Sequence, residues 1–164
     1  MLLPALLKLI HVCSAFWLVS GLWGRALVMS QAARATEMRT VEALVQLAGR
    51  FERRVVRPST FAVLLGGLAT AWMQGLPILG VLEGRGPNWI LASLVLVVSV
   101  FLLIPLVFLP RGNVFRDALQ DAVAAGRPTP ALAAAFADPA VAMAHTYEWI
   151  AVAAVIVLMV TKPF

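Results

Sequence analysis

The sequence predicts an all-α, polytopic membrane protein in which four transmembrane helices form a bundle. Hydrophobic residues make up 62% of the chain, charged residues only 13%, and the mean hydropathy is +0.92. A soluble domain of 164 residues has too little interior to bury so much apolar surface. Four apolar segments also reach the roughly 20 residues needed to cross a bilayer. We expect residues 1–164 to form a single integral membrane domain.

The first span is expected at residues 3–27. Its apolar stretch is long enough to cross the membrane, and Gly21, Gly24 and Arg25 follow where a signal peptide would have a small-residue cleavage site. We therefore interpret it as a retained helix. Ser20 and Gly24 are four residues apart and allow a neighbouring helix to approach closely.

The other three spans are expected at residues 59–79, 88–109 and 141–160. Ser59 or Thr60 is suited to begin the second span, and Pro77 and Gly80 are expected to mark its exit. A short turn then leads to the third span. Small residues repeat every four positions along the second span, which favours close packing against another helix: Ala62, Gly66 and Thr70.

Two longer connections join the remaining spans. Within residues 30–57, apolar positions recur every three or four residues opposite charged ones, which predicts an amphipathic helix at the membrane surface. Residues 111–140 are expected to form two short helices separated at Pro128 and Pro130. We find no sequence repeat that relates the two halves.

Arginine placement predicts the orientation of the spans. One arginine, Arg85, lies in the turn between the second and third spans, and Arg111, Arg116 and Arg127 follow the third. The connection after the first span is the richest in arginine: Arg25, Arg34, Arg39, Arg50, Arg53, Arg54 and Arg57. The positive-inside rule therefore predicts that both long connections are cytoplasmic and both termini are outside.

The net charge of +5 does not indicate nucleic-acid binding here. The basic residues flank apolar spans, where they contact anionic lipid, so the bilayer is the expected partner. Cys13 is the single cysteine, which excludes an internal disulfide and a cysteine-rich metal site.

The first span carries the strongest indication of function. Lys8, His11 and Arg25 fall on one helical face together with small and apolar residues, and we expect that face to point into the bundle. Ionisable groups within a membrane are costly and usually serve a function. His11 is therefore a candidate metal or haem ligand, or else a packing residue that bonds to a neighbouring helix. Lys8 has the alternative of extending to the outer surface.

The fourth span contains a second pair of ionisable residues. His145 and Glu148 are three residues apart and share a face. Glu148 is expected to form a structural ion pair with Arg25, or together with His145 to begin a proton relay. His145 is also a candidate second haem ligand, although helix rise places it about 13 Å from the level of His11. That offset disfavours ligation of one haem by both histidines.

The residues Lys8-Leu-Ile-His11, then Trp17, Gly21, Leu22 and Arg25, with the C-terminal Lys162-Pro163, resemble HemJ-type protoporphyrinogen oxidases and their relatives. The relatives include CopD-type proteins and an uncharacterised family of small four-helix bacterial membrane proteins, which is the most similar. The resemblance implies an inner-membrane location and a haem b ligated by His11. The enzymes also use a lysine on the third helix, whereas residues 88–109 contain none, which favours the uncharacterised branch.

The sequence-based hypothesis is therefore a haem-binding membrane protein with His11 as the ligand. Lys8 and Arg25 are expected to bind the haem propionates. Two alternatives stay open: a structural or accessory subunit of a membrane complex or homo-oligomer, and a small transporter. Whether the protein is an enzyme is left undetermined.

Overall fold

The computed structural model describes residues 2–85 and 88–163, and within these ranges it contains helices and no strand. The fold is all-α, as the sequence predicts. The elements are α1 (Leu2–Arg34), α2 (Met38–Phe51), η1 (Glu52–Val56), α3 (Arg57–Met73), η2 (Gly80–Glu83), α4 (Trp89–Leu103), η3 (Ile104–Phe108), α5 (Leu109–Ala125), α6 (Pro130–Phe136) and α7 (Pro139–Thr161). Here η2 is a short 3₁₀ helix, and η1 and η3 are π-helical turns.

Four helical stretches are long and apolar enough to cross a membrane. They are Leu2–Arg34, Met38–Met73, Trp89–Ala125 and Pro130–Thr161, and each contains most or all of one predicted span. All four are longer than predicted, because the helices continue into the segments that connect the spans. The predicted break near Pro128 and Pro130 is confirmed, since α5 ends at Ala125 and α6 begins at Pro130, but α5 continues the helix of α4 and is not a separate short helix.

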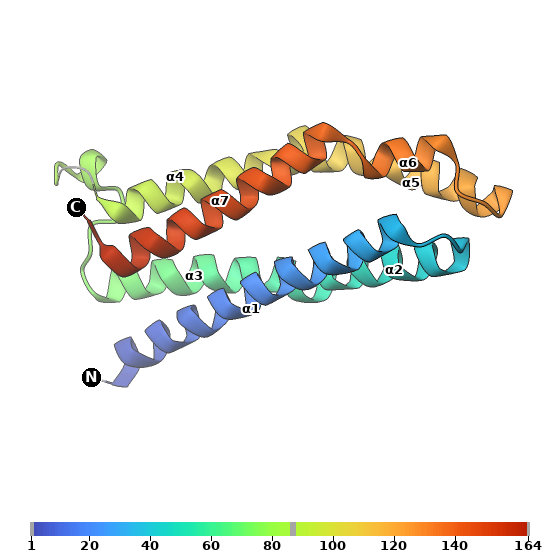
Figure 1. Ribbon diagram of the computed structural model, residues 1–164. Coiled ribbons are helices and arrows are strands. Elements are labelled where there is room, and N and C mark those ends of the chain that lie inside the picture. The colour runs from blue at the N-terminus through green and yellow to red at the C-terminus, as the bar shows by residue number, and fades with distance from the viewer. Residues whose placement is uncertain (1, 86–87, 164) are drawn as a thin grey trace. The chain divides into compact units, whose positions relative to one another are not determined.

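The chain divides into two compact units. Unit 1 contains α1, α2, η1 and α3, and unit 2 contains η2, α4, η3, α5 up to Ala124, α6 and α7. In each unit one long helical arm packs against another, which gives a helical hairpin (Figure 1). The expectation of one membrane domain for residues 1–164 stays a prediction.

In unit 1, α1 packs along both α2 and α3. Two glycines of α1 make the close approach possible. A Cβ atom at Gly21 would lie 2.6 Å from Cγ1 of Val55, and one at Gly24 would lie 2.7 Å from the ring of Phe51. Gly24 was one of the small residues expected to permit this packing.

The amphipathic helix predicted within residues 30–57 is α2. Its apolar residues Met38, Val41 and Ala48 are buried, and α2 packs against α1. The helix is not a separate surface element, because η1 joins it to α3 without a break in the helix. Its position relative to a membrane surface stays a prediction.

A proline accompanies each π-helical turn. Pro58 follows η1, and Pro105 lies within η3. A proline has no N–H to donate, and its ring clashes with the carbonyl of the residue four positions earlier. One extra residue in the turn relieves that clash while the helix continues. The arm from α2 to α3 and the arm from α4 to α5 therefore each continue past a proline that would otherwise end or kink the helix.

Helix α3 ends at Met73, six residues before the predicted end of the second span. The cause is Gly75, which has a φ of +65°. The N–H of Leu76 donates to the carbonyl of Ala71 and that of Gly75 to the carbonyl of Trp72, the bonding pattern of a Schellman motif. The prediction that Pro77 and Gly80 mark the exit is wrong, because this glycine ends the helix first.

Side-chain caps fix the helix starts of unit 2. Asn88 accepts a hydrogen bond from the N–H of Leu91 at 2.7 Å and donates to the carbonyl of Pro77. Asp138 caps α7 by accepting from Ala140 and Val141. Its other carboxylate oxygen lies 3.2 Å from Arg111, so the cap also ties α7 to the start of α5.

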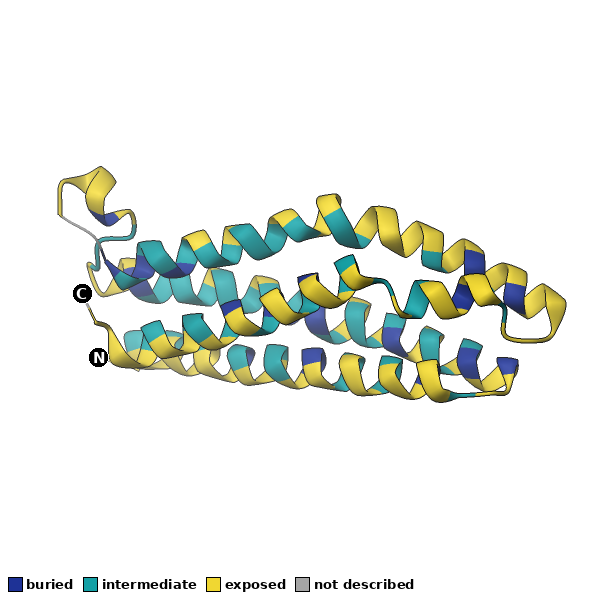
Figure 2. Ribbon diagram, turned by 45° about the horizontal axis from the view of Figure 1, so that its top comes forward, coloured by how far each residue is buried: buried dark blue, intermediate teal, exposed yellow. Residues whose placement is uncertain are grey.

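Much of the length of each long helix is exposed (Figure 2), and many of the exposed residues are large and apolar. Examples from three of the spanning stretches are Phe16, Leu65 and Ile150, exposed by 72%, 63% and 61%. A water-soluble surface rarely presents so many large apolar groups together. We interpret these faces as the surface that contacts lipid.

Candidate functional site

The face of α1 that carries Lys8, His11 and Arg25 is largely turned toward neighbouring helices. Ser14 and Leu22 are buried, and His11 and Arg25 are half-buried. Lys8 is exposed, so the expectation that it points inward is wrong. Its place near the N-terminal end of the helix fits the alternative of a side chain that extends outward.

His11 lies against α3. Its Nδ1 atom is 2.9 Å from the carbonyl oxygen of Val63. The ring lies over Gly67, where a Cβ atom would be 2.9 Å from Cε1 and 3.2 Å from Nδ1. Gly66 faces the backbone of His11, with its Cβ position 3.5 Å from the His11 Cα atom. Gly67 thus provides the space in which the imidazole sits, and Gly66 lies at ordinary contact distance from the His11 backbone.

The contact with Val63 determines which nitrogen of His11 is available. A carbonyl oxygen only accepts hydrogen bonds, so Nδ1 must carry the proton. In the neutral ring Nε2 then holds the lone pair, and it has no hydrogen-bond partner among residues 2–85 and 88–163. This arrangement, with Nδ1–H bonded to a carbonyl and Nε2 available, is typical of metal-ligating histidines.

Arg25 forms an ion pair that the sequence analysis missed. Its Nη1 atom lies 2.8 Å from Oε2 of Glu52 in η1, and the other carboxylate oxygen accepts from Nε of Arg57 at 3.2 Å. The side chains of Arg25 and Glu52 are only 19% and 31% exposed. The signal for this pair was the position of Glu52 just before the second span, at the boundary that Arg25 marks on the first.

The ion pair expected between Arg25 and Glu148 would join the two units and stays a prediction. Within unit 2, Glu148 is buried and accepts from Nδ1 of His145 at 3.0 Å, as expected for residues sharing a helical face. The His145 ring also stacks on Phe108, with the ring centroids 4.7 Å apart.

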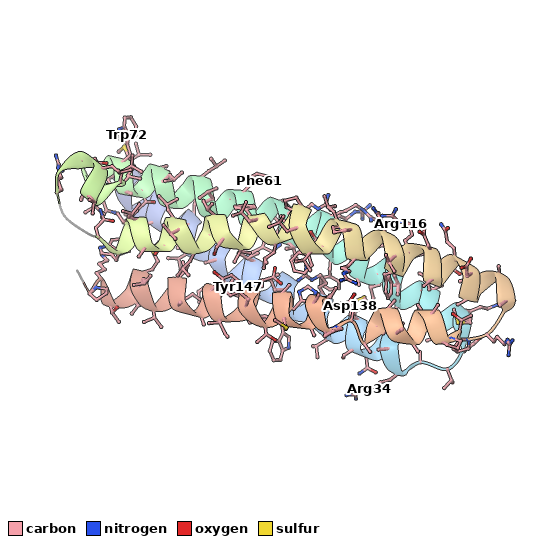
Figure 3. The ribbon with its side chains drawn as sticks, turned by 90° about the horizontal axis from the view of Figure 1, so that it is seen from above. Arg34, Phe61, Trp72, Arg116, Asp138 and Tyr147 are labelled. Carbon is pink, nitrogen blue, oxygen red and sulfur yellow. The ribbon has the colours of Figure 1, made fainter. Side chains whose placement is uncertain are left out.

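A second polar contact links the helices of unit 2. The hydroxyl groups of Ser99 on α4 and Tyr147 on α7 are 2.5 Å apart. Figure 3 labels Tyr147 and also Phe61 and Trp72, which project away from α3 and are 58% and 75% exposed. Ser99 and Tyr147 therefore meet between the helices, whereas Phe61 and Trp72 lie outside.

Among the described residues, no three histidine, cysteine or carboxylate side chains come close enough to hold a metal ion. His11 thus provides one ligand and not a complete set. Every buried side-chain nitrogen or oxygen in this part of the chain has a hydrogen-bond partner.

These features define an integral membrane protein with four candidate spans. Residues 5–163 match the family described as "Predicted integral membrane protein (DUF2269)", and the chain belongs to that family. No curated protein and no solved structure matches the chain.

Proposed function

We propose that this membrane protein binds haem b through Nε2 of His11. The observation that carries the proposal is the fixed state of the His11 ring, in which Val63 holds the proton on Nδ1 and the lone pair stays on Nε2. We also propose a bacterial inner-membrane location with both termini outside, supported by the arginine-rich connections.

The single ligand favours haem over a bare metal ion. Zinc and copper sites in proteins are built from three or four protein ligands, and the described residues contain no such cluster. A porphyrin supplies four nitrogen ligands itself, so one histidine is sufficient to anchor it.

The other predicted haem contacts differ in how well they fit. Lys8 is three residues from His11, about 4.5 Å along the helix, and is exposed, which suits contact with a propionate. Arg25 is fourteen residues away, about 21 Å, and is bound to Glu52. We therefore assign Arg25 to the ion pair and not to the haem. His145 as a second ligand stays a prediction.

A bound haem b would supply a one-electron redox centre. The protein's own contribution is to orient the ligand: the Val63 carbonyl and the surface of Gly67 hold the neutral imidazole in one rotamer and one tautomer. Because the sequence resembles HemJ-type oxidases, we propose electron transfer or porphyrinogen oxidation as the activity.

The absorption spectrum of the detergent-solubilised protein, expressed with a haem precursor, tests the proposal. We expect a Soret band that is lost in His11→Ala and kept in Lys8→Gln, with helix content measured by circular dichroism to confirm folding. His145→Ala separately tests the predicted second ligand: a shifted or weakened Soret band would support it, and an unchanged band would exclude it. A colourless, folded wild-type protein, or a Soret band unchanged by His11→Ala, would overturn the proposal.

The second candidate is an accessory subunit or homo-oligomer in which His11 only locks helix packing. It is supported by the close fit of the ring against Gly67. Copurification of a defined partner with a colourless protein would favour this function.

A further inference from the structure

Four arginines follow one another across the end of α2, η1 and the start of α3. All four side chains are exposed, that of Arg57 by 63%. The four residues are Arg50, Arg53, Arg54 and Arg57. Their spacings of three and four residues keep them near one side of the helical arm. We call this set the arginine cluster.

The opposite side of the same arm packs against α1. There Phe51 and Val55 lie on the two glycines of α1, and Val56 is buried. The arginine cluster therefore lies on the outer side of the hairpin.

Positive charge is in large excess at this level of unit 1. Glu52 is the one acidic residue between positions 43 and 82, and its carboxylate is shared by Arg25 and Arg57. Arg57 uses Nε for this contact, which leaves its terminal nitrogens available. Arg53 lies along the helix beside Gly49, whose Cβ position would be 3.2 Å from Nη1 of Arg53.

The cluster also marks where the apolar span begins. From Pro58 to Met73 the helix has no charged residue. A hydrocarbon layer that begins at Pro58 would place the guanidinium groups at its edge, where the phosphates of lipids are found.

We infer that the arginine cluster is a binding site for the headgroup of an anionic phospholipid. Guanidinium groups bind phosphate oxygens through paired hydrogen bonds, and this geometry is specific to arginine. Anionic lipid supplies both the negative charge that the cluster lacks and the apolar tails that suit the exposed face of α3. This inference is independent of haem binding.

Lipid retention by the full-length protein tests the site. The purified protein in a mild detergent is mixed with phosphatidylglycerol or phosphatidylcholine, and bound lipid is counted by native mass spectrometry. We expect preferential retention of phosphatidylglycerol. The double variant Arg53→Gln/Arg54→Gln should weaken it by roughly 25-fold, about 5-fold for each arginine.

The matched control is Arg39→Gln/Arg127→Gln, which removes the same charge from exposed positions outside the cluster. It should retain the lipid as the wild type does. An equal loss in the control would show attraction by net charge alone and would overturn the site, as would equal retention of the two lipids. Inorganic phosphate at millimolar concentration should not displace the lipid; if it does, the cluster binds free phosphate instead.

Discussion

His11 and Gly67 form the most constrained contact among the candidate site residues. Helix interiors rarely contain two consecutive glycines without a packing reason, because each glycine costs about 1 kcal/mol relative to alanine. Here the cost is offset by the imidazole, which occupies the space that a side chain at position 67 would take.

Gly67→Ala should therefore destabilise the protein by about 1–3 kcal/mol, because the new methyl group would overlap the imidazole. The neighbouring Gly66→Ala is the matched control. Its methyl group would make ordinary contact with His11, so the better helix propensity of alanine should leave stability unchanged or raised. Thermal unfolding in detergent measures both, and equal effects of the two variants would contradict the contact.

The protonation state of His11 gives a second prediction at this scale. In protein labelled with nitrogen-15 at histidine, without haem and at a pH where the ring is neutral, the NMR spectrum should show the His11 proton on Nδ1. A carbonyl acceptor permits no other neutral form. A proton on Nε2 would show that the bond to Val63 is absent.

The ion pair of Arg25 and Glu52 is only partly shielded from solvent. Glu52→Gln should cost about 1 kcal/mol, since exposed pairs contribute little and this one is half-buried. A double-mutant cycle with Arg25→Gln isolates their coupling. Glu42→Gln removes a carboxylate that bonds only to Gln46 among the described residues, and it should have a smaller effect.

The sequence identified His11, Arg25, His145 and Glu148 as notable because ionisable residues are rare in apolar segments. It could not identify Val63, Gly67 or Glu52 as their neighbours. Those contacts depend on the register between two arms of a hairpin, and the short connection between the arms does not determine that register from sequence alone.

At the scale of elements, α7 depends on a cap with two functions. Asp138 accepts from two backbone N–H groups and pairs with Arg111. Asp138→Ala should cost about 1–2 kcal/mol, whereas Asp138→Asn keeps an accepting oxygen and should cost less. Hydrogen exchange at residues 140 to 142 reports the loss of the cap. Equal costs for the two variants would mean that the charge, and not the cap, carries the stabilisation.

Sequence patterns predicted where the spans lie but not where their helices end. Asn88 and the prolines near position 128 gave correct boundaries, because a cap and a proline act locally. The end of α3 was missed because Gly75 acts through a positive φ that a sequence does not reveal. The continuity of α2 with α3 was missed because Ser59 or Thr60 was expected to begin a new helix, whereas a π-helical turn joins the two helices.

For the whole molecule, the orientation is a prediction that labelling can test. In a Cys13→Ser background, single cysteines at Thr36 and Arg127 should react with a membrane-impermeant maleimide only after cells are opened. A cysteine at Glu83, in the turn with a single arginine, should react in intact cells. Reaction of a cysteine at position 36 in intact cells would show that the orientation is opposite to the predicted one.

The length of the helices has a consequence for the part of each hairpin that lies beyond the lipid. Helix α1 has 33 residues and so extends about 50 Å, whereas the hydrocarbon layer is about 30 Å thick. The surplus of roughly 20 Å must stand in water or among lipid headgroups. There α1 and α2 form a stalk of two packed helices, which are joined at residues 35–37. A stalk of this kind is a convenient place to graft an epitope tag or a fluorescent protein without disturbing the intramembrane residues.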